Sequence, residues 1–218
     1  IQRRHQKLIE ETPSVALKDS QRTKLARAAA RAAKATGYTN AGTAEFLLAP
    51  DGSFYFIEFN ARIQVEHPVT EEVTDKDLVV EQIRVAAGEH LGYSAVKPQG
   101  CSIEARVYAE DPENNFAPSP GRVEALHLPG GPGIRVDSHL FNGYKVPPFY
   151  DSLLAKIISR GTTREQAIDR LVGALTEFRI TGIKTTAGLC AKILNSGRFR
   201  RGDISTALIE DFLPKPAA

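Results

Sequence analysis

The chain has 218 residues, of which 42% are hydrophobic and 25% are charged, and its formal net charge is +2. This composition is ordinary for a globular protein with one large or two small domains, and it gives no bulk reason to expect nucleic acid or an anionic membrane as a partner. No apolar run approaches the roughly 18 residues that a membrane-spanning helix needs. Two cysteines, Cys101 and Cys190, make no disulfide framework, so we expect a reducing compartment, the cytoplasm.

The start of the chain is unusual. It opens with IQRRHQKLIE, which contains no initiator Met and no signal-peptide pattern. An opening this dense in polar groups is typical of the middle of a domain. We therefore expect a fragment of a longer protein.

The first part of the chain predicts a helix, a hairpin and a second helix. Residues 21–35 are rich in Ala and Arg, which favour helix, and Gly37 provides a stop. Two β-rich runs, AGTAEFLLAP and DGSFYFIEF, flank the turn Pro50-Asp51-Gly52. We expect an antiparallel hairpin there, with the apolar strand after the turn buried. The second helix is expected over residues 77–87.

From Cys101 onward the chain is rich in strands, in the runs CSIEARVYAE, GRVEALHL, GIRVDSHL and LLAKIISRG. Thr162 and Glu165 predict a capping box for a helix over residues 163–178, and a last helix is expected over residues 186–195. The pattern favours an α+β fold in two parts, residues 1–98 and residues 99–218. The second part should hold an antiparallel sheet with helices.

Polar residues around the hairpin suggest a cation site. Glu45 and Glu58 lie nearly equidistant from the turn, so they should face each other across the strands, where like charges are destabilising unless a cation lies between them. The two-residue period of a strand puts Glu58 and Asn60 on one face. Two carboxylates and an amide oxygen are ligands that Mg²⁺ takes when it also holds phosphates. Chance placement is the competing explanation.

A second polar group follows the hairpin. Arg62, Gln64 and Glu66 alternate, so an extended segment would direct all three side chains the same way. Arg offers a planar fork for a small anion, and a buried Glu can act as a base. An exposed edge strand with salt bridges explains the same pattern, and spacing alone slightly favours it. His67-Pro68 is expected to fix a turn, because a residue before Pro prefers extended conformations.

Cationic groups elsewhere have two explanations each. The opening run Gln2–Lys7 contains four potentially cationic side chains, which fits either a solvated face or an anion site. Arg106 lies within the apolar run IEARVYA, where an arginine needs a partner. That partner is either a ligand or an acid such as Glu104, Glu110 or Asp111.

These segments resemble a known family. EFLL and DGSFYFIEFNARIQVEHPVTE are similar to the end of the ATP-grasp region of biotin carboxylase, and RRHQK, IEARVYAEDP, APSPGRV, VPPFYDSLLAKII and GIKTT resemble the same family in the same order. The resemblance covers essentially the whole chain. It implies that residues 1–98 are the C-terminal portion of an ATP-grasp domain and that residues 99–218 are the biotin carboxylase C-terminal domain.

The resemblance implies a ligase that carboxylates biotin on a carrier protein, with ATP first converting bicarbonate to carboxyphosphate. The implied cofactors and substrates are ATP, Mg²⁺ or Mn²⁺, bicarbonate and biotin. The implied partners are a biotin carboxyl carrier protein, a carboxyltransferase and a second copy of the chain, bound through the C-terminal domain. Acetyl-CoA carboxylase and fatty acid biosynthesis form one implied setting, while propionyl-CoA, methylcrotonyl-CoA and pyruvate carboxylases share the same domain.

The resemblance also assigns roles by motif. Arg62 would hold the reacting anion, Glu66 would deprotonate bicarbonate, and Arg106 would stabilise the biotin enolate. The remaining implied contacts are Glu45, Glu58 and Asn60 for the metal, Gln2, His5 and Leu47 for the nucleotide, Lys7, Gln64 and the backbone of Val65 for bicarbonate, and Arg135 for the dimer interface.

Two departures limit the resemblance. Phe59 and Ala61 stand where the family commonly has Met and Thr or Ser, although both alternate away from the proposed ligand face. The family's N-terminal domain, its glycine-rich lid and its ATP-gripping lysines should lie before Ile1, so we expect the chain alone neither to bind ATP tightly nor to turn over. Two alternatives stay open: another ATP-grasp ligase, such as one making carbamoyl phosphate, and a non-catalytic dimerisation or assembly module.

Overall fold

The structure is a computed structural model that describes residues 1–94 and 96–214. It contains two compact units, which we call the sheet unit, Ile1–Thr12 with the chain from Gln99 onward, and the hairpin unit, Pro13–Pro98. The first residues fall in the sheet unit because strand β3 (Ile9–Thr12) pairs with strand β6 (Cys101–Tyr108). This contact-based division differs from the expected one at residues 98 and 99. The boundary between family domains stays a prediction.

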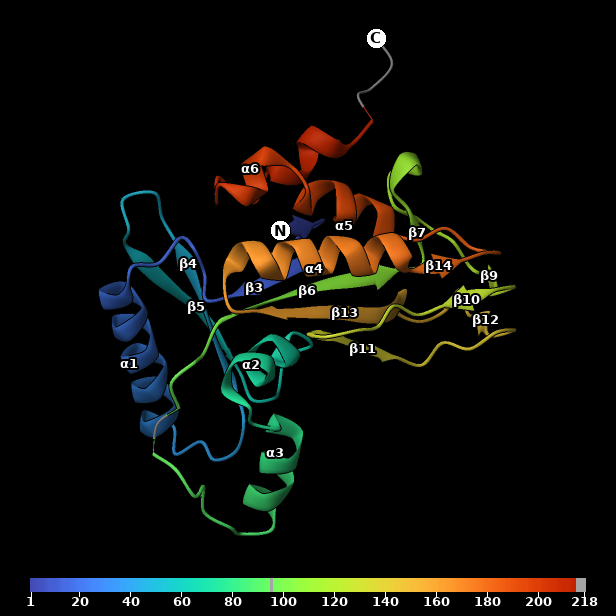
Figure 1. Ribbon diagram of the computed structural model, residues 1–218. Coiled ribbons are helices and arrows are strands. Elements are labelled where there is room, and N and C mark those ends of the chain that lie inside the picture. The colour runs from blue at the N-terminus through green and yellow to red at the C-terminus, as the bar shows by residue number, and fades with distance from the viewer. Residues whose placement is uncertain (95, 215–218) are drawn as a thin grey trace. The chain divides into compact units, whose positions relative to one another are not determined.

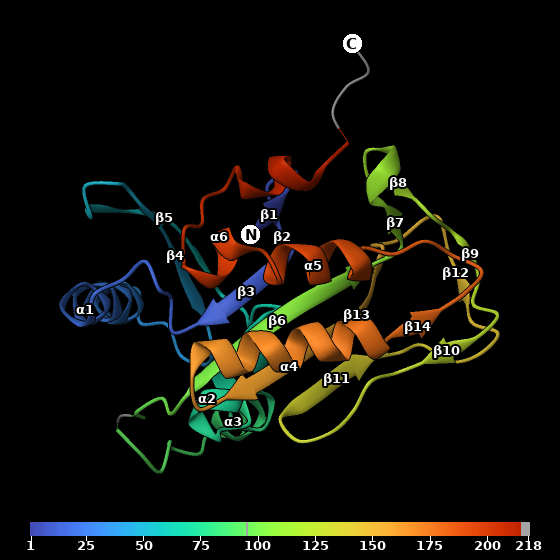
Figure 2. The same ribbon diagram turned by 45° about the horizontal axis from the view of Figure 1, so that its top comes forward.

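The sheet unit is built on four antiparallel strands in the order β11-β13-β6-β3. Strand β11 spans Ile134–Ser138, and strand β13 spans Leu153–Gly161. Helices α4 (Arg164–Glu177) and α5 (Ala187–Leu194) lie on one face of this sheet (Figures 1 and 2). The expected α+β fold, with an antiparallel sheet and helices in its second part, is confirmed.

Alternation along β6 explains how the core forms. Ile103, Ala105 and Val107 are fully buried and pack in one cluster with side chains of α4 such as Leu171. The residues between them, including Arg106, project from the opposite face, because successive side chains in a strand alternate. The sheet thus buries an apolar face under the helices and keeps a polar row on its other face.

The remaining elements of the sheet unit are short. They are β1 (Gln2–Arg3), β2 (Gln6–Lys7), β7 (Glu110–Asp111), η1 (Pro112–Asn114), β8 (Ala117–Pro118), β9 (Gly121–Arg122), β10 (Leu126–His127), β12 (Lys145–Val146), β14 (Arg179–Ile180), α6 (Gly197–Arg200) and η2 (Leu208–Phe212). The expectation of one strand over residues 121–128 is wrong. Its two ends form β9 and β10, which pair with different partners, β12 and β14.

Helix α4 begins one residue later than its predicted cap. The Thr163 side chain, and not that of Thr162, accepts the backbone N–H of Gln166, and the Gln166 side chain accepts the backbone N–H of Thr162 at 2.8 Å. The expected capping box of Thr162 with Glu165 is therefore wrong by one position. Both threonines are acceptable N-caps, and the sequence pattern could not separate them.

The hairpin unit contains α1 (Asp19–Ala35), β4 (Thr43–Leu48), β5 (Phe54–Asn60), α2 (His67–Thr74) and α3 (Leu78–Ala86). The predicted hairpin is confirmed, since β4 and β5 pair antiparallel around the expected turn. Helices were expected over residues 21–35 and 77–87, and α1 and α3 lie there. No helix in the described ranges is long and apolar enough to cross a membrane.

Two expectations for the hairpin unit are wrong. Strand β5 is not buried, because Tyr55, Phe56 and Ile57 are 59%, 54% and 58% exposed. The pair His67-Pro68 begins helix α2 instead of fixing an isolated turn. Proline suits the first turn of a helix, because its missing N–H would have no intrahelical partner there.

The pair of β11 and β13 carries a small ion cluster. Asp137 lies opposite Lys156 in the strand register, and its carboxylate lies 3.3 Å from that ammonium group. The Arg135 guanidinium binds the same carboxylate with two bonds, Nε to Oδ1 at 2.8 Å and Nη2 to Oδ2 at 3.0 Å. Partial burial acts to raise the pKa of Asp137, but Arg135 and then Lys156 outweigh it and lower the pKa.

We expect the substitution Leu171→Ala to lower the free energy of unfolding by about 2–5 kcal/mol, because it leaves a cavity under a fully packed helix. Leu128→Ala is the matched control, since Leu128 is 37% exposed and should change the free energy of unfolding by no more than about 0.5 kcal/mol. Urea unfolding followed by circular dichroism measures both values. Equal losses in the two variants would contradict this account of the core.

Asp137→Asn should make stability less dependent on acid. A lowered folded-state pKa stabilises the protein above the unfolded pKa of about 3.9, and this contribution disappears as the pH falls through the folded value. The variant should therefore be less stable than the original chain at pH 6, and the difference should shrink toward pH 3. Urea unfolding at both pH values measures it, with Asp19→Asn, at a fully exposed side chain, as the control. A difference that grows toward pH 3 would overturn the expected sign.

Candidate functional site

The two acids of the hairpin face each other as predicted. Glu45 and Glu58 are direct partners in the register of β4 and β5, and the register shifts immediately beyond Glu45. The Asn60 Nδ2 atom lies 2.9 Å from Glu58 Oε1 and 3.4 Å from Glu45 Oε1. One amide group therefore donates to both carboxylates and joins the two strands at the end of the hairpin.

The network continues past the end of the strand. Gln64 Nε2 donates to Glu45 Oε1 at 2.6 Å, and Arg62 Nη1 donates to Gln64 Oε1 at 3.3 Å. Arg62 also binds the carbonyl of Ile63 at 3.1 Å, so its guanidinium is held beside the hairpin. The acid pair and the arginine thus belong to one hydrogen-bonded group.

The expected extended triad is wrong at its last residue. Val65 and Glu66 form a turn, and Glu66 is the N-cap residue of α2, with φ −80° and ψ 10°. The backbone N–H of His67 closes this turn on the carbonyl of Gln64 at 3.2 Å. Helix α2 therefore changes the direction of the chain before the third member of the alternation, while Arg62 and Gln64 stay together.

Leu47 lies apart from this polar group. It is 56% exposed on β4, opposite Tyr55, so it presents apolar surface on the hairpin. This exposed position is compatible with packing against an aromatic base. Its assignment as a nucleotide contact stays a prediction.

Within the described ranges, no group of three or more His, Cys, Asp or Glu side chains is placed to hold a metal ion. The acid pair supplies two carboxylates, and Asn60 would have to provide the third ligand through its amide oxygen. An amide that turns over exchanges its N–H₂ group for its oxygen. The donor set therefore fits a hard divalent cation that takes its other ligands from phosphates or water.

The sheet unit carries the other predicted site residues. Gln2 and Lys7 are partners in the β1–β2 hairpin, and His5 lies exposed in the turn between them. The turn residues Arg4 and His5 both have positive φ, 50° and 63°. Such a two-residue turn matches the twist of a hairpin, although neither residue is Gly or Asn.

Arg106 is buried, with 8% of its surface exposed. Its Nη2 atom lies 2.6 Å from Glu10 Oε1, and its Nε atom lies 3.9 Å from Glu104 Oε1. The structural ion pair considered from the sequence therefore exists, but its main partner is Glu10 on β3. Glu110 binds a different arginine, Arg3, at 2.7 Å.

Tyr108 connects the two groups of the sheet unit. Its hydroxyl donates to the carbonyl of Lys7 at 3.3 Å and accepts from Arg106 Nη1 at 3.5 Å. Burial raises the pKa of Tyr108, although the Arg106 charge opposes that rise. The sequence reasoning missed Glu10, Tyr108 and Arg3. The alternation of residues 104, 106, 108 and 110 could have indicated a polar row on β6, but not its partners on the first strands.

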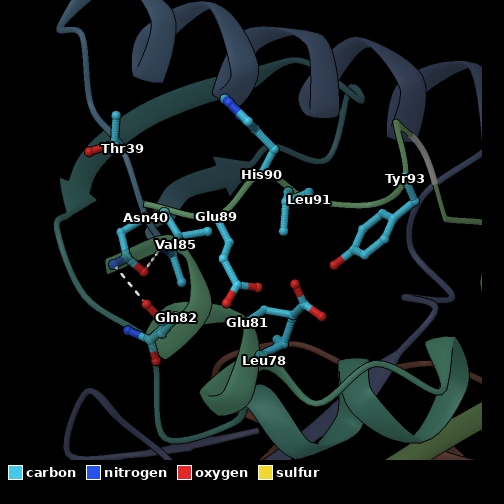
Figure 3. A pocket seen from close by; sticks show the side chains of 11 residues that line it. Thr39, Asn40, Leu78, Glu81, Gln82, Val85, Glu89, His90, Leu91 and Tyr93 are labelled. Atoms are coloured by element: carbon cyan, nitrogen blue, oxygen red, sulfur yellow. Dashed lines mark hydrogen bonds between the residues drawn. The ribbon is translucent and has the colours of Figure 1, made fainter. Parts of the chain in front are cut away.

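A pocket of about 500 Å³ lies in the hairpin unit, away from the acid pair. Figure 3 shows the carboxylates of Glu81 and Glu89 and the hydroxyl of Tyr93 directed into it, with Leu91 between them and His90 pointing away. The predicted site residues are not among the residues that line it. The pocket therefore adds nothing to the candidate site.

Comparisons with known proteins bear on both units. The family model "Carbamoyl-phosphate synthase L chain, ATP binding domain" matches residues 1–94, and the model "Biotin carboxylase C-terminal domain" matches residues 104–211. A biotin carboxylase of Nostoc sp. is 51% identical over 213 residues, covering 97% of this chain and 48% of the relative. One of the pyruvate carboxylase subunits of Methanothermobacter thermautotrophicus is 48% identical, over 97% of this chain and 43% of its own.

A solved structure agrees with these relatives. The biotin carboxylase domain of 2-oxoglutarate carboxylase from Hydrogenobacter thermophilus, a dimer in complex with MgADP, ADP and bicarbonate, has a TM-score of 0.95 and 48% identity, and the match covers 97% of this chain and 47% of that one. The chain spans about half the length of the curated relatives that it matches. It therefore belongs to the biotin carboxylase family and includes the family's C-terminal domain.

Proposed function

We propose that this chain supplies part of the site for ATP-dependent carboxylation of biotin on a carrier protein, with bicarbonate as the carbon source and carboxyphosphate as the intermediate. The observation that carries the proposal is the network of the hairpin unit. There, Glu45 and Glu58 oppose each other in register, and Asn60 and Gln64 connect them to Arg62. This arrangement offers a place for a cation beside a place for a small anion.

Glu45, Glu58 and Asn60 would hold Mg²⁺ or Mn²⁺. Two carboxylates at directly opposed positions repel each other, and a divalent cation between them removes that repulsion. When bound, the metal would neutralise charge on the ATP phosphates. Gln2, His5 and Leu47 are proposed to contact the nucleotide.

The anion site is proposed to bind bicarbonate through Arg62, Gln64, the backbone of Val65, and Lys7. Arg62 has a planar fork of N–H donors that suits a carbonate-like anion, and its positive charge would stabilise negative charge as carboxyphosphate forms. Glu66 is proposed as the base that removes the bicarbonate proton. Its place at the start of α2 puts it two residues beyond Gln64, which the network fixes.

The biotin side of the reaction is proposed to use Arg106. Its guanidinium is buried beside Glu10, and a cation in such a site would stabilise the enolate oxygen of deprotonated biotin. This residue also favours biotin over carbamate as the acceptor. Residues 104–211, which include it, match the biotin carboxylase C-terminal domain. The carbamoyl-phosphate synthase model covers the other part of the chain alone.

Assembly and setting belong to the proposal as well. The Hydrogenobacter neighbour is a dimer of biotin carboxylase domains, and we propose that this chain also dimerises, through its C-terminal domain with Arg135 at the interface. A biotin carboxyl carrier protein and a carboxyltransferase are the proposed partners. Acetyl-CoA carboxylase, fatty acid biosynthesis and the cytoplasm are the proposed setting.

The test uses a chimera in which this chain is joined to the part of the Nostoc biotin carboxylase that it does not match. We expect the chimera to cleave ATP in a bicarbonate-dependent reaction and to carboxylate free biotin. Arg62→Ala should lower that turnover by about 10²- to 10³-fold, the loss typical for removing one preorganised charge donor.

Arg84→Ala is the matched control for Arg62→Ala. Arg84 is an exposed arginine of the same unit, paired with Glu81 at 3.3 Å, and its loss should leave turnover unchanged. Thermal unfolding of both variants checks that folding is intact. Bicarbonate-dependent cleavage that survives Arg62→Ala would overturn the anion site.

Glu58→Gln separates metal binding from folding. Removing one of two opposed charges relieves repulsion, so the free energy of unfolding should not fall. The Mg²⁺ concentration for half-maximal ATP cleavage by the chimera should nevertheless rise at least tenfold, because one ionised ligand is lost. Glu177→Gln, an exposed change at the end of α4, should affect neither quantity. An unchanged Mg²⁺ requirement would exclude Glu58 as a ligand.

A further inference from the structure

Arg3 is a buried arginine outside the residues assigned to the site. It lies in β1, next to Gln2, and only 4% of its side chain is exposed. Its Nη2 atom lies 2.7 Å from Glu110 Oε1, and its Nη1 atom lies 2.8 Å from Gln6 Oε1. The guanidinium carbon lies 4.8 Å from the centroid of the Tyr108 ring. Arg3 thus spans from its own hairpin to the row of side chains along β6 and β7.

The partner of Arg3 also fixes a second segment. Glu110 is 7% exposed, and its Oε1 atom accepts the Ser152 hydroxyl at 2.7 Å as well as Arg3. The Ser152 carbonyl in turn accepts the backbone N–H of Ala109 at 2.7 Å. One buried carboxylate oxygen therefore joins the β1–β2 hairpin to the loop that precedes β13.

The β1–β2 hairpin needs an external support of this kind. Each of its strands has two residues, and its turn holds Arg4 and His5 at positive φ, where residues other than Gly and Asn are strained. A two-stranded ribbon this short is not stable by itself. Contacts to the rest of the sheet unit must keep the turn in its conformation.

These contacts come from alternate positions of one strand direction. Tyr108 binds the carbonyl of Lys7, and Glu110 binds the side chain of Arg3. The two supporting residues are two positions apart, so they project on the same side of the chain. His5 lies between the two supported residues, in the strained turn.

We propose that Arg3 is a positioning residue, whose ion pair with Glu110 holds the β1–β2 hairpin so that His5 and Lys7 keep their places. The functional meaning of those two places rests on the proposed function. The support of the hairpin by Arg3 does not, and the two are tested by separate measurements.

The first measurement is amide hydrogen exchange on the chain itself, with Arg3→Gln compared to Arg164→Gln. Arg164 is the matched control, because it makes an ion pair of the same length, 2.7 Å to Glu11, and stacks 4.7 Å from the Phe199 ring. We expect the hairpin amides, including that of Leu8, to exchange at least tenfold faster in Arg3→Gln than its change in global stability explains. In Arg164→Gln they should follow global stability.

Arg3→Lys keeps the variant series informative where Arg3→Gln leaves too little folded chain. Lysine keeps the charge beside Glu110 but lacks the fork that also reaches Gln6. The hairpin amides should then exchange at least threefold faster than global stability explains. Hairpin exchange that follows global stability in the Arg3 variants, as in Arg164→Gln, would reduce Arg3 to a structural residue and overturn the inference.

The second measurement uses the chimera and separates KM from kcat. Arg3→Lys should raise the KM for bicarbonate at least fivefold and leave kcat within twofold, because Lys7 is displaced while the reacting groups remain. Arg164→Gln should change neither. An unchanged KM in Arg3→Lys would break the link between the hairpin and the site. If the unsubstituted chimera does not cleave ATP, the proposed function fails, and hydrogen exchange still decides whether Arg3 holds the hairpin.

Discussion

Both units place two carboxylates directly opposite each other across antiparallel strands, and the surrounding polar groups are arranged to compensate for that repulsion. In the sheet unit, Glu10 faces Glu104, and the guanidinium of Arg106 lies 2.6 Å from Glu10. In the hairpin unit, Glu45 faces Glu58, and neutral amides occupy the corresponding positions. An amide supplies a partial charge where the guanidinium supplies a full one. The second pair is therefore the one whose chemistry calls for a cation from outside the chain, which is why the proposed metal site is placed there.

The hairpin and its acid pair could be predicted because the information is local. Pro50-Asp51-Gly52 sets the turn, the turn sets the register, and the register brings Glu45 opposite Glu58. The partner of Arg106 could not be found in the same way. Glu10 reaches it only through the pairing of β3 with β6, and no turn connects those two strands. Local pattern showed that a buried arginine needs a partner, and tertiary structure decided which acid supplies it.

The wrong expectations share a physical cause. Alternating or continuous apolar residues show that a surface would gain free energy by being covered, but they do not show that anything in the chain covers it. The exposed face of β5, with Phe56 54% exposed, is the clearest case. The turn expected at His67-Pro68 failed for a different reason. The restriction that proline places on the residue before it competes with proline's preference for the first turn of a helix, and here the second effect decides the local structure.

The ion pair of Arg3 with Glu110 is hard to explain by stability alone. Burying two charges costs desolvation free energy that their attraction only partly recovers, and well-packed apolar side chains often do as well. An apolar pair would not fix direction, however, because hydrophobic contacts are tolerant of rotation and sliding, whereas a guanidinium that binds Glu110 and Gln6 at the same time has one placement. The hairpin it holds contains a strained turn between two residues assigned to ligand contacts. A costly, directional interaction is what such a segment requires, so the cost itself points to the geometry of the site and not to the core as the reason for the pair.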